Sequence, residues 1–321
     1  MRPTGPLHLG HLVGVLDNWK QLQEQYDCFF MVADWHALMS EYEHPERIRA
    51  STYENVLDWL AWGIDPQRSV IFRQSDVPEH VELYTILSIL TPLGWLERIP
   101  TYKEQLRELE GREIATHGFL GYPVLQTADI LAYQGYVVPV GEDQLPHLEL
   151  AREIVRRFHF LYRCELFPEP KPLLTKASKL LGTDGRKMSK SYQNTISLSD
   201  SPEAIRKAAQ SMFTDPLRIK MTDPGHPETC NVCHYWQVFD PARAPQLWEE
   251  CRTSKRGCVQ NKRELAEQLI AMTEPFRAIR ARMGSDYGEV ERLLQQGASR
   301  AREVAGRTMA QVRRVIGLSQ R

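Results

Sequence analysis

The sequence lacks the features that mark membrane, secreted and fibrous proteins. No run approaches about 18 consecutive apolar residues, the length that a membrane-spanning helix needs. The first residues, MRPTG, contain no apolar signal region. Six cysteines among 321 residues are too few for a disulfide scaffold, and we find neither an internal repeat nor a low-complexity tract. These absences predict a cytoplasmic protein with no membrane partner.

Neither sign of charge dominates. Forty Lys and Arg residues against 41 Asp and Glu give a formal net charge of −1, so any binding of nucleic acid must come from local asymmetry. One such asymmetry lies in the last 45 residues, which hold ten arginines and four acids. This basic end is either a solvated helix face or an RNA contact. The hydrophobic fraction of 42% and the length allow one large globular domain or two ordinary ones.

Short apolar runs alternate with helical patterns in the first half of the chain. Strands are expected at 28–34, 69–72 and 135–140, and helices at 46–62, 79–90 and 144–159. This alternation predicts an α/β fold with a doubly wound parallel sheet, in which ligands bind beyond the carboxyl ends of the strands. After about residue 195 only helical periodicity remains, at 201–212, 260–283 and 287–316.

The first motif is HLGH, near the start of the chain. Gly5 and Pro6 form a turn, and a helix follows. His8 and His11 are three residues apart, so they share one face at the positive end of that helix, where free backbone N–H groups and two imidazoles suit a polyphosphate. Gly10 lets a flat ring approach the backbone. By itself the pattern is more typical of two surface histidines.

The second motif is GRKMSKS, residues 185–191. Lys187 and Lys190 lie in a loop rich in glycine and serine, where they can hold phosphate oxygens as mobile point charges. A loop with two such lysines is usually just solvated. The full sequence KMSKS is a much more specific signal than two lysines three residues apart.

The two motifs together resemble those of the class I aminoacyl-tRNA synthetases, in which they bind ATP. Residues 121–131 and 138–144 look like the amino-acid pocket segments of the tryptophan/tyrosine subclass, and their form is closest to the bacterial tryptophanyl-tRNA synthetases. The resemblance implies a Rossmann-like catalytic domain, residues 1–192, and a helical region that binds the tRNA anticodon, residues 193–321, with the last helix packing back on the catalytic domain. It also implies a homodimer.

The implied reaction is the ATP-dependent activation of L-tryptophan to tryptophanyl-adenylate, followed by transfer to tRNA(Trp). No nucleophile of the enzyme is required, because positioning and charge stabilisation carry such a reaction. Mg²⁺ would bridge the ATP phosphates. By resemblance, the catalytic residues are His8, His11, Lys187 and Lys190. The ATP-binding residues are Thr4, Gly10, Gly141, Asp143, Met188 and Ser189. The tryptophan-binding residues are Tyr122, Gln126, Asp129, Val138, Val140 and Gln144.

Asp129 is the residue expected to select the substrate. Indole has a single polar atom, a donor-only N–H, and a buried carboxylate is its natural partner. We therefore expect Asp129→Ala to impair tryptophan binding and to leave the fold intact, because the carboxylate serves the ligand. Without the resemblance, Asp129 would be taken for a partly exposed helix residue and Asp143 for a helix N-cap.

Two departures from the family pattern stand out. Gln126 occupies a position that is often Met, so one wall of the pocket is expected to be more polar. Only Met1 and Arg2 precede the Pro-Thr-Gly turn, where the fold has a strand; either the start codon is misassigned or the chain lacks that strand, which would expose an edge. Alternative functions are the same reaction with tyrosine and a non-catalytic paralogue that binds tRNA.

Four cysteines lie close together in the helical half. Their spacing is Cys-x2-Cys-x17-Cys-x6-Cys, and thiolate sets of this kind bind zinc or iron–sulfur clusters. Some relatives carry a four-cysteine iron–sulfur motif in this region, and the spacing of Cys251 and Cys258 matches its middle. Cys230 matches its start with a shorter gap, Asn261 occupies the fourth position, and Cys233 would supply the missing thiolate. A [4Fe–4S] cluster, zinc and no metal remain the alternatives.

Overall fold

The computed structural model describes residues 1–100, 102, 115–174, 180–284 and 286–318. Its described strands are β1 (Phe29–Val32), β2 (Val70–Arg73), β3 (Val137–Val140) and β4 (Lys171–Leu174). Helical segments up to the end of the α/β part are α1 (Leu9–His11), η1 (Leu12–Leu16), α2 (Asp17–Leu22), α3 (Asp34–Glu41), α4 (Pro45–Trp62), η2 (Gln74–Asp76), α5 (Glu79–Leu90), α6 (Leu93–Glu97), α8 (His117–Leu131), η3 (Glu142–Gln144), α9 (Leu145–Tyr162) and η4 (Lys190–Tyr192). The later ones are α10 (Pro202–Ser211), η5 (Pro227–Thr229), α11 (Asn231–Phe239), α12 (Ala244–Arg252), α13 (Cys258–Met283) and α14 (Tyr287–Val315).

The described strands are parallel, as the α/β class requires. β1 pairs with β2, with Phe29 opposite Val70, and β3 pairs with β4, with Val137 opposite Lys171. These are two separate two-stranded ladders. The sequence analysis missed β4, which contains a proline and is exposed at both ends, so it carries little of a buried strand's apolar pattern.

The start of the chain lies beside β1. The Met1 amino group donates to the Met31 carbonyl at 2.6 Å, and the Ala33 amide donates to the Met1 carbonyl at 2.9 Å. This alternation is the hydrogen-bonding pattern of two neighbouring parallel strands. Met1 therefore continues the β1–β2 pair on its other side.

Most of the expected helices are present, with ends shifted by a few residues. The match is closest for α4, α5 and α14. α4 ends where its apolar pattern stops, at Gly63, whose φ of +103° is the left-handed conformation that glycine adopts without strain. The helix that follows HLGH is interrupted by η1, a π-helical stretch, before it continues as α2.

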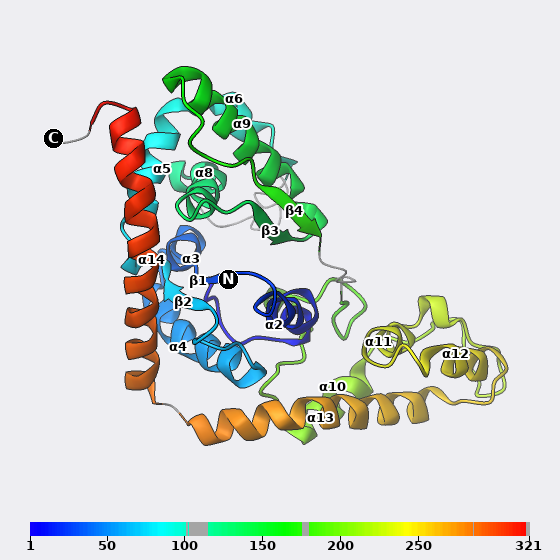
Figure 1. Ribbon diagram of the computed structural model, residues 1–321. Coiled ribbons are helices and arrows are strands. Elements are labelled where there is room, and N and C mark those ends of the chain that lie inside the picture. The colour runs from blue at the N-terminus through cyan, green and yellow to red at the C-terminus, as the bar shows by residue number, and fades with distance from the viewer. Residues whose placement is uncertain (101, 103–114, 175–179, 285, 319–321) are drawn as a thin grey trace.

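The two longest helices frame the molecule. In Figure 1, α13 runs along the bottom and α14 rises along one side, where it packs against β2, α4 and α5. Gly297 of α14 allows a very close approach, because a Cβ there would lie only 1.8 Å from the carbonyl oxygen of Ile71 in β2. The last helix thus lies on the α/β part of the chain.

Several arginines of the basic end hold these helices in place. Arg280 pairs with Asp58 at 3.1 Å, and Arg313 pairs with Glu82 at 2.7 Å. Arg300 donates to the carbonyl oxygen of Pro66 at 3.2 Å. These three side chains therefore have structural partners within the protein. Arg321, the last arginine, lies outside the described residues.

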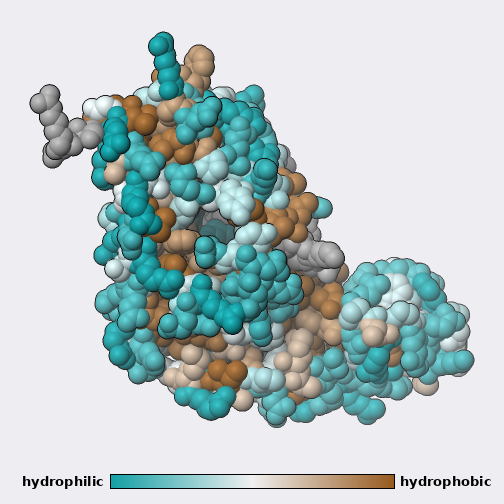
Figure 2. All heavy atoms as spheres, viewed as in Figure 1, coloured by the Kyte–Doolittle hydropathy of each residue, from teal (hydrophilic) through white to brown (hydrophobic). Residues whose placement is uncertain are grey.

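The apolar core contains residues from both halves of the chain. One cluster joins Leu9 and Phe30 to Trp236 and Leu265, so α11 and α13 share a core with the segments around the N-terminus. α11 and α12 form a lobe that projects to one side, and the face of this lobe shown in Figure 2 is largely hydrophilic. None of the helices in the described part of the chain is long and apolar enough to cross a membrane.

Candidate active site

The two signature motifs come together in space. His8 and Ser197 form an antiparallel β-bridge, which joins HLGH to the stretch that follows KMSKS. Met188 of KMSKS is buried, and its Sδ would lie 3.6 Å from a Cβ at Gly10. A side chain at Gly10 would therefore crowd the contact between the motifs. Only the resemblance predicted that the two motifs lie close together; neither motif indicates it by itself.

The two histidines of HLGH are neutral and locked in orientation. His8 Nδ1 accepts a hydrogen bond from the Gly10 amide at 3.1 Å, and His11 Nδ1 accepts one from the His8 amide at 3.2 Å. Burial, with a contribution from the charge of Lys190, lowers the pKa of His8 to about 4. Burial lowers the pKa of His11 to about 2. The hydrogen of each neutral ring therefore sits on Nε2. The imidazoles thus occupy the amides of His8 and Gly10, so these two are not among the free N–H groups that the motif was expected to offer a phosphate.

The lysines of KMSKS differ in their surroundings. Lys187 is exposed, whereas Lys190 is partly buried and its Nζ lies 3.5 Å from where a Cβ of Gly5 would be. Burial, and the nearby charge of Arg2, lower the pKa of Lys190 to about 8. Thr4 is exposed and lies in the same turn as Gly5.

Asn194 holds the KMSKS loop through hydrogen bonds to its main chain. Its Oδ1 accepts a hydrogen bond from the Ser189 amide at 2.8 Å, and its Nδ2 donates to the Lys187 carbonyl at 3.1 Å. The side chain is buried. Sequence reasoning missed Asn194, since an asparagine after a loop carries no signal of its own.

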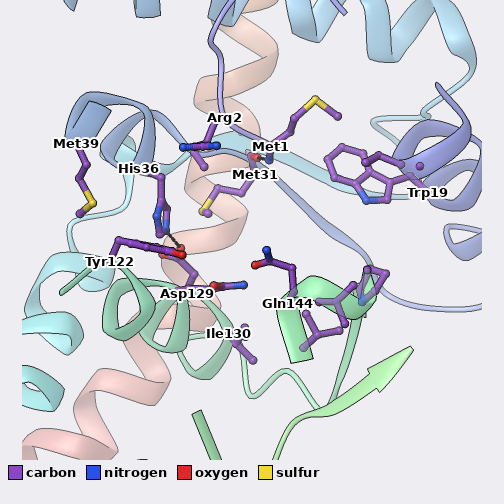
Figure 3. A pocket seen from close by; sticks show the side chains of 18 of the residues that line it. Met1, Arg2, Trp19, Met31, His36, Met39, Tyr122, Asp129, Ile130 and Gln144 are labelled. Carbon is purple, nitrogen blue, oxygen red and sulfur yellow. Dashed lines mark hydrogen bonds and ion pairs between the residues drawn. The ribbon is translucent and has the colours of Figure 1, made fainter. Parts of the chain in front are cut away.

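All six side chains predicted to bind the amino acid line one cavity of about 500 Å³. They are Tyr122, Gln126, Asp129, Val138, Val140 and Gln144. A hollow opens near the middle of the face drawn in Figure 2. Figure 3 shows Tyr122 and Asp129 of α8 beside each other, with the Asp129 carboxylate pointing toward His36. Gly141 also lines it, whereas the histidines of HLGH and the lysines of KMSKS do not. The predicted residues thus divide into two neighbouring groups.

Asp129 receives hydrogen bonds from three elements. His36 of α3 donates to Oδ2 at 2.8 Å, and Gln74 of η2 and His80 of α5 donate to Oδ1 at 2.8 and 2.6 Å. The carboxylate side chain is 10% exposed. Burial would raise the pKa of Asp129, but the hydrogen bonds from the two histidines outweigh it and hold the pKa well below its ordinary value. Asp129 is therefore a buried anion in the cavity wall.

A second network joins other polar residues that line the cavity. His147 Nε2 lies 3.0 Å from the Tyr122 hydroxyl, and His147 Nδ1 lies 3.0 Å from both Gln126 Oε1 and Gln144 Oε1. Burial lowers the pKa of His147 to about 4, so the ring is neutral at pH 7. With the hydrogen on Nδ1, the ring donates to a glutamine and accepts from the Tyr122 hydroxyl. Gln126 therefore makes its wall polar, as its departure from Met predicts.

The segment after β3 carries the residues predicted to hold the ribose. Asp143 is exposed, and its Oδ2 accepts a hydrogen bond from Gln144 Nε2 at 2.9 Å. A Cβ at Gly141 would lie 2.7 Å from Asp143 Oδ1, so a side chain there would displace the carboxylate. No side chain caps the start of α9. The alternative interpretation of Asp143 as a helix N-cap is therefore wrong.

Comparison with known proteins identifies the family. Residues 1–274 match the family described as "tRNA synthetases class I (W and Y)". The chain belongs to this family. The tryptophan–tRNA ligase of Thermotoga maritima is 48% identical over 99% of this chain and 98% of its own length. That of Aquifex aeolicus is 42% identical over 99% of this chain and 98% of its own. Tryptophanyl-tRNA synthetase from Campylobacter jejuni, solved with ADP and tryptophan, superposes with a TM-score of 0.87 at 34% identity and covers 99% of this chain and 98% of that one.

These matches confirm the predicted family and the class I fold of this synthetase.

Three donors around Asp129 were missed by sequence reasoning. His36 and Gln74 had a usable signal, since His36 lies four residues after β1 and Gln74 directly after β2, and the carboxyl ends of parallel strands form the ligand-binding edge in such sheets. His80 had none, because a histidine in the first turn of an amphipathic helix is ordinary. His147 was missed for the same reason.

The four cysteines of the synthetase lie together but not as a metal cage. The Cys233 thiol hydrogen-bonds to the sulfurs of Cys230 and Cys251, which lowers the pKa of Cys230 to about 6 and that of Cys251 to about 7, and raises the pKa of Cys233 itself. Cys258 shares a small cavity with Cys230 and Cys251. Cys233 thus serves as the protonated donor between two more acidic thiols.

This arrangement does not fit the predicted iron–sulfur cluster. The shared cavity has about 10 Å³ of free volume, room for about one water molecule. Asn261, at the fourth motif position, accepts a hydrogen bond from Trp236 Nε1 at 2.8 Å, and its Nδ2 lies 3.8 Å from Cys233 Sγ. Among the described residues, no group of three or more His, Cys, Asp or Glu side chains is arranged to hold a metal ion. The residues therefore do not support a four-cysteine metal site.

Proposed function

We propose that this synthetase activates L-tryptophan with ATP and transfers it to tRNA(Trp). The observation that carries the proposal is the cavity of about 500 Å³, in which a buried anionic carboxylate lies among apolar side chains. The Thermotoga and Aquifex relatives, named tryptophan–tRNA ligases, support it over the full length of the chain.

The amino acid occupies the cavity with its indole toward Asp129. The indole N–H donates to this carboxylate, and Val138 and Val140 of β3 contact the ring. Tyr122 and Gln144, which also line the cavity, hold the substrate ammonium group. The carboxylate of the amino acid then points toward HLGH and attacks the α-phosphate of ATP.

ATP lies between the two motifs. Neutral His8 and His11 donate from Nε2 to phosphate oxygens, so they stabilise the leaving group as hydrogen-bond donors and not as cations. Lys187 and Lys190 supply the positive charge, with Met188 and Ser189 between them against the nucleotide. Gly10 and Thr4 contact the nucleotide from the other motif, and Gly141 and Asp143 hold its ribose.

Mg²⁺ enters with the ATP phosphates. The described residues offer no cluster of acidic ligands that would hold the ion without them. Mg²⁺ characteristically keeps several waters and binds through substrate phosphates in such sites. When bound, the ion neutralises phosphate charge.

The helical region, residues 193–321, binds the anticodon arm of the tRNA, and the enzyme acts as a homodimer. Large apolar side chains on α5, α6 and α9 support the dimer: Ile89, Leu93 and Phe160 are 80, 63 and 82% exposed on elements that lie together at the top of Figure 1. The cytoplasm remains the predicted location, because the tRNA substrate is there.

The same reaction with tyrosine fits the cavity less well. A phenol hydroxyl both donates and accepts, whereas Asp129, as an anion, can only accept. A non-catalytic paralogue is disfavoured by the complete HLGH and KMSKS motifs, which are joined in the fold.

ATP–pyrophosphate exchange with tryptophan, tyrosine and phenylalanine, measured side by side, tests the first step. Exchange should depend on tryptophan, and charging of tRNA(Trp) should follow with the same preference. Faster exchange with tyrosine would overturn the substrate assignment. Binding of tRNA without any exchange would favour the paralogue.

A further inference from the structure

The hydrogen bonds at Asp129 leave one place for a ligand. A carboxylate has about four lone-pair positions, two on each oxygen. Gln74 and His80 both donate to Oδ1 and so occupy that oxygen, whereas Oδ2 accepts only from His36 among the described contacts. A substrate N–H therefore finds one acceptor position, on Oδ2.

His80 is held between Asp129 and a tyrosine. His80 is fully buried, with Nδ1 2.6 Å from Asp129 Oδ1 and Nε2 2.7 Å from the Tyr133 hydroxyl. The Asp129 carboxylate can only accept, so the ring hydrogen is on Nδ1, and Nε2 accepts a hydrogen bond from the Tyr133 O–H. Tyr133 is itself held by stacking on Phe29 of β1, with ring centroids 4.5 Å apart.

The chain from tyrosine to carboxylate lies behind the cavity wall. Asp129 and His36 line the cavity, but Gln74, His80 and Tyr133 do not. These three side chains therefore have no direct contact with the amino acid. What they can control is the direction in which the Asp129 carboxylate presents its remaining lone pair.

We propose that His80 and Tyr133, together with Gln74, are positioning residues that occupy Oδ1 of Asp129 and so reserve Oδ2 for the single N–H of the substrate. This inference rests on the proposed function and extends it to residues outside the pocket. Without the donor from His80, the carboxylate can rotate about its Cβ–Cγ bond, and the geometry toward the N–H is no longer unique. The loss concerns only substrates that carry this N–H.

Two substrates distinguish a positioning effect of these residues from a general loss of protein stability. Tryptophan has the indole N–H, and β-(3-benzothienyl)alanine has sulfur in its place with nearly the same shape. The quantity measured is the ratio of kcat/KM for tryptophan to kcat/KM for this analogue in ATP–pyrophosphate exchange. A merely structural effect lowers both values and leaves their ratio unchanged.

Four variants define the experiment. Tyr133→Phe removes the hydroxyl and keeps the ring, and His80→Leu removes the donor to Asp129. His80→Asn keeps an N–H donor near the position of Nδ1 and serves as the conservative rescue. Ser88→Ala is the matched control, because Ser88 is also on α5 and its buried hydroxyl has no hydrogen-bond partner.

We expect the ratio to fall about tenfold in Tyr133→Phe and His80→Leu, as the loss of a well-formed hydrogen bond to a charged group does. His80→Asn should recover most of it, and Ser88→Ala should match the wild type. A wild-type-like ratio in Tyr133→Phe overturns the inference, as does an equal loss for both substrates; this variant alone decides if His80→Leu fails to fold. A wild-type enzyme that uses both substrates equally also overturns it. A wild-type enzyme inactive with tryptophan refutes the proposed function instead.

Discussion

His8 and Ser197 are partners in an antiparallel β-bridge. The Leu9 amide donates to the Ile196 carbonyl and the Leu198 amide donates to the Leu7 carbonyl, each at 3.0 Å. The segment that follows KMSKS is thereby attached to HLGH by main-chain hydrogen bonds. Lys187 and Lys190, which we propose to bind phosphate, lie a few residues before this attachment, so the loop is anchored at the end that follows them.

Lys190→Ala should slow adenylate formation by roughly 10²-fold, because a preorganised charge toward the developing phosphate charge is lost. Pre-steady-state formation of tryptophanyl-adenylate measures the effect. The control is Lys207→Ala on α10, which removes an exposed lysine from outside the site. An unchanged rate in Lys190→Ala would remove this residue from the mechanism.

The pH dependence of ATP use should reflect Lys190. Because burial lowers the pKa of its ammonium group to about 8, the charged form is lost as the pH rises through about 8. We therefore expect kcat/KM for ATP, which reports groups of the free enzyme, to fall above this pH. Lys190→Arg keeps its charge and should move the decline to higher pH. A decline at the same pH in both proteins would assign it to another group.

Asp129→Ala should lower both activity and stability, which corrects the expectation of an intact fold. Its carboxylate accepts hydrogen bonds from α3, η2 and α5, and each buried donor left unpaired costs about 1–3 kcal/mol. Urea unfolding should show a loss of at least about 2 kcal/mol, and kcat/KM for tryptophan should fall roughly 10–200-fold. Asp129→Asn, which keeps one acceptor oxygen, should lose less stability. An unfolding midpoint equal to the wild type in Asp129→Ala would show that these donors find other partners.

Gly297→Ala should destabilise the packing of α14 on β2. A Cβ there would lie 1.8 Å from the Ile71 carbonyl oxygen, so the helix must move, at a cost of about 1–3 kcal/mol. Gly306→Ala on the same helix is the matched control, since its Cβ would meet nothing closer than Glu79 Oε1 at 3.9 Å. That substitution should stabilise by about 0.5–1 kcal/mol. Thermal unfolding that ranks the two variants in the opposite order would refute this account of the interface.

Protein prepared without oxygen should contain neither iron nor acid-labile sulfide. The Cys233 thiol bridges its neighbours and Asn261 is bonded to Trp236, so the fourth ligand of a cluster is missing. Iron, sulfide and zinc analyses measure this directly. About four iron and four sulfide per chain would mean that the side chains rearrange around a cluster. Zinc near one per chain would favour the alternative metal.

The family and the α/β class could be derived from the sequence because both depend on local order along the chain. HLGH, KMSKS and the segments of residues 121–131 and 138–144 are contiguous, and each carries its chemistry in its own residues. Strand and helix positions followed from hydrophobic periodicity, which reports burial of one face of a local element. The ends of β1, β2 and α5 were predicted closely for that reason.

Only the tertiary structure decided what surrounds the chemical groups. The hydrogen bonds of Asp129 come from residues 49 to 93 positions away, so no local pattern encodes them. The neutral state of His8 and His11 follows from burial against Lys190, and the thiols lie together through contacts among α11, α12 and α13. Protonation and hydrogen bonding depend on neighbours in space and on exclusion of water. The sequence by itself therefore determined the family and predicted the residues of the two motifs and the pocket, and the fold decided which neighbours surround them and in which charge state and direction they lie.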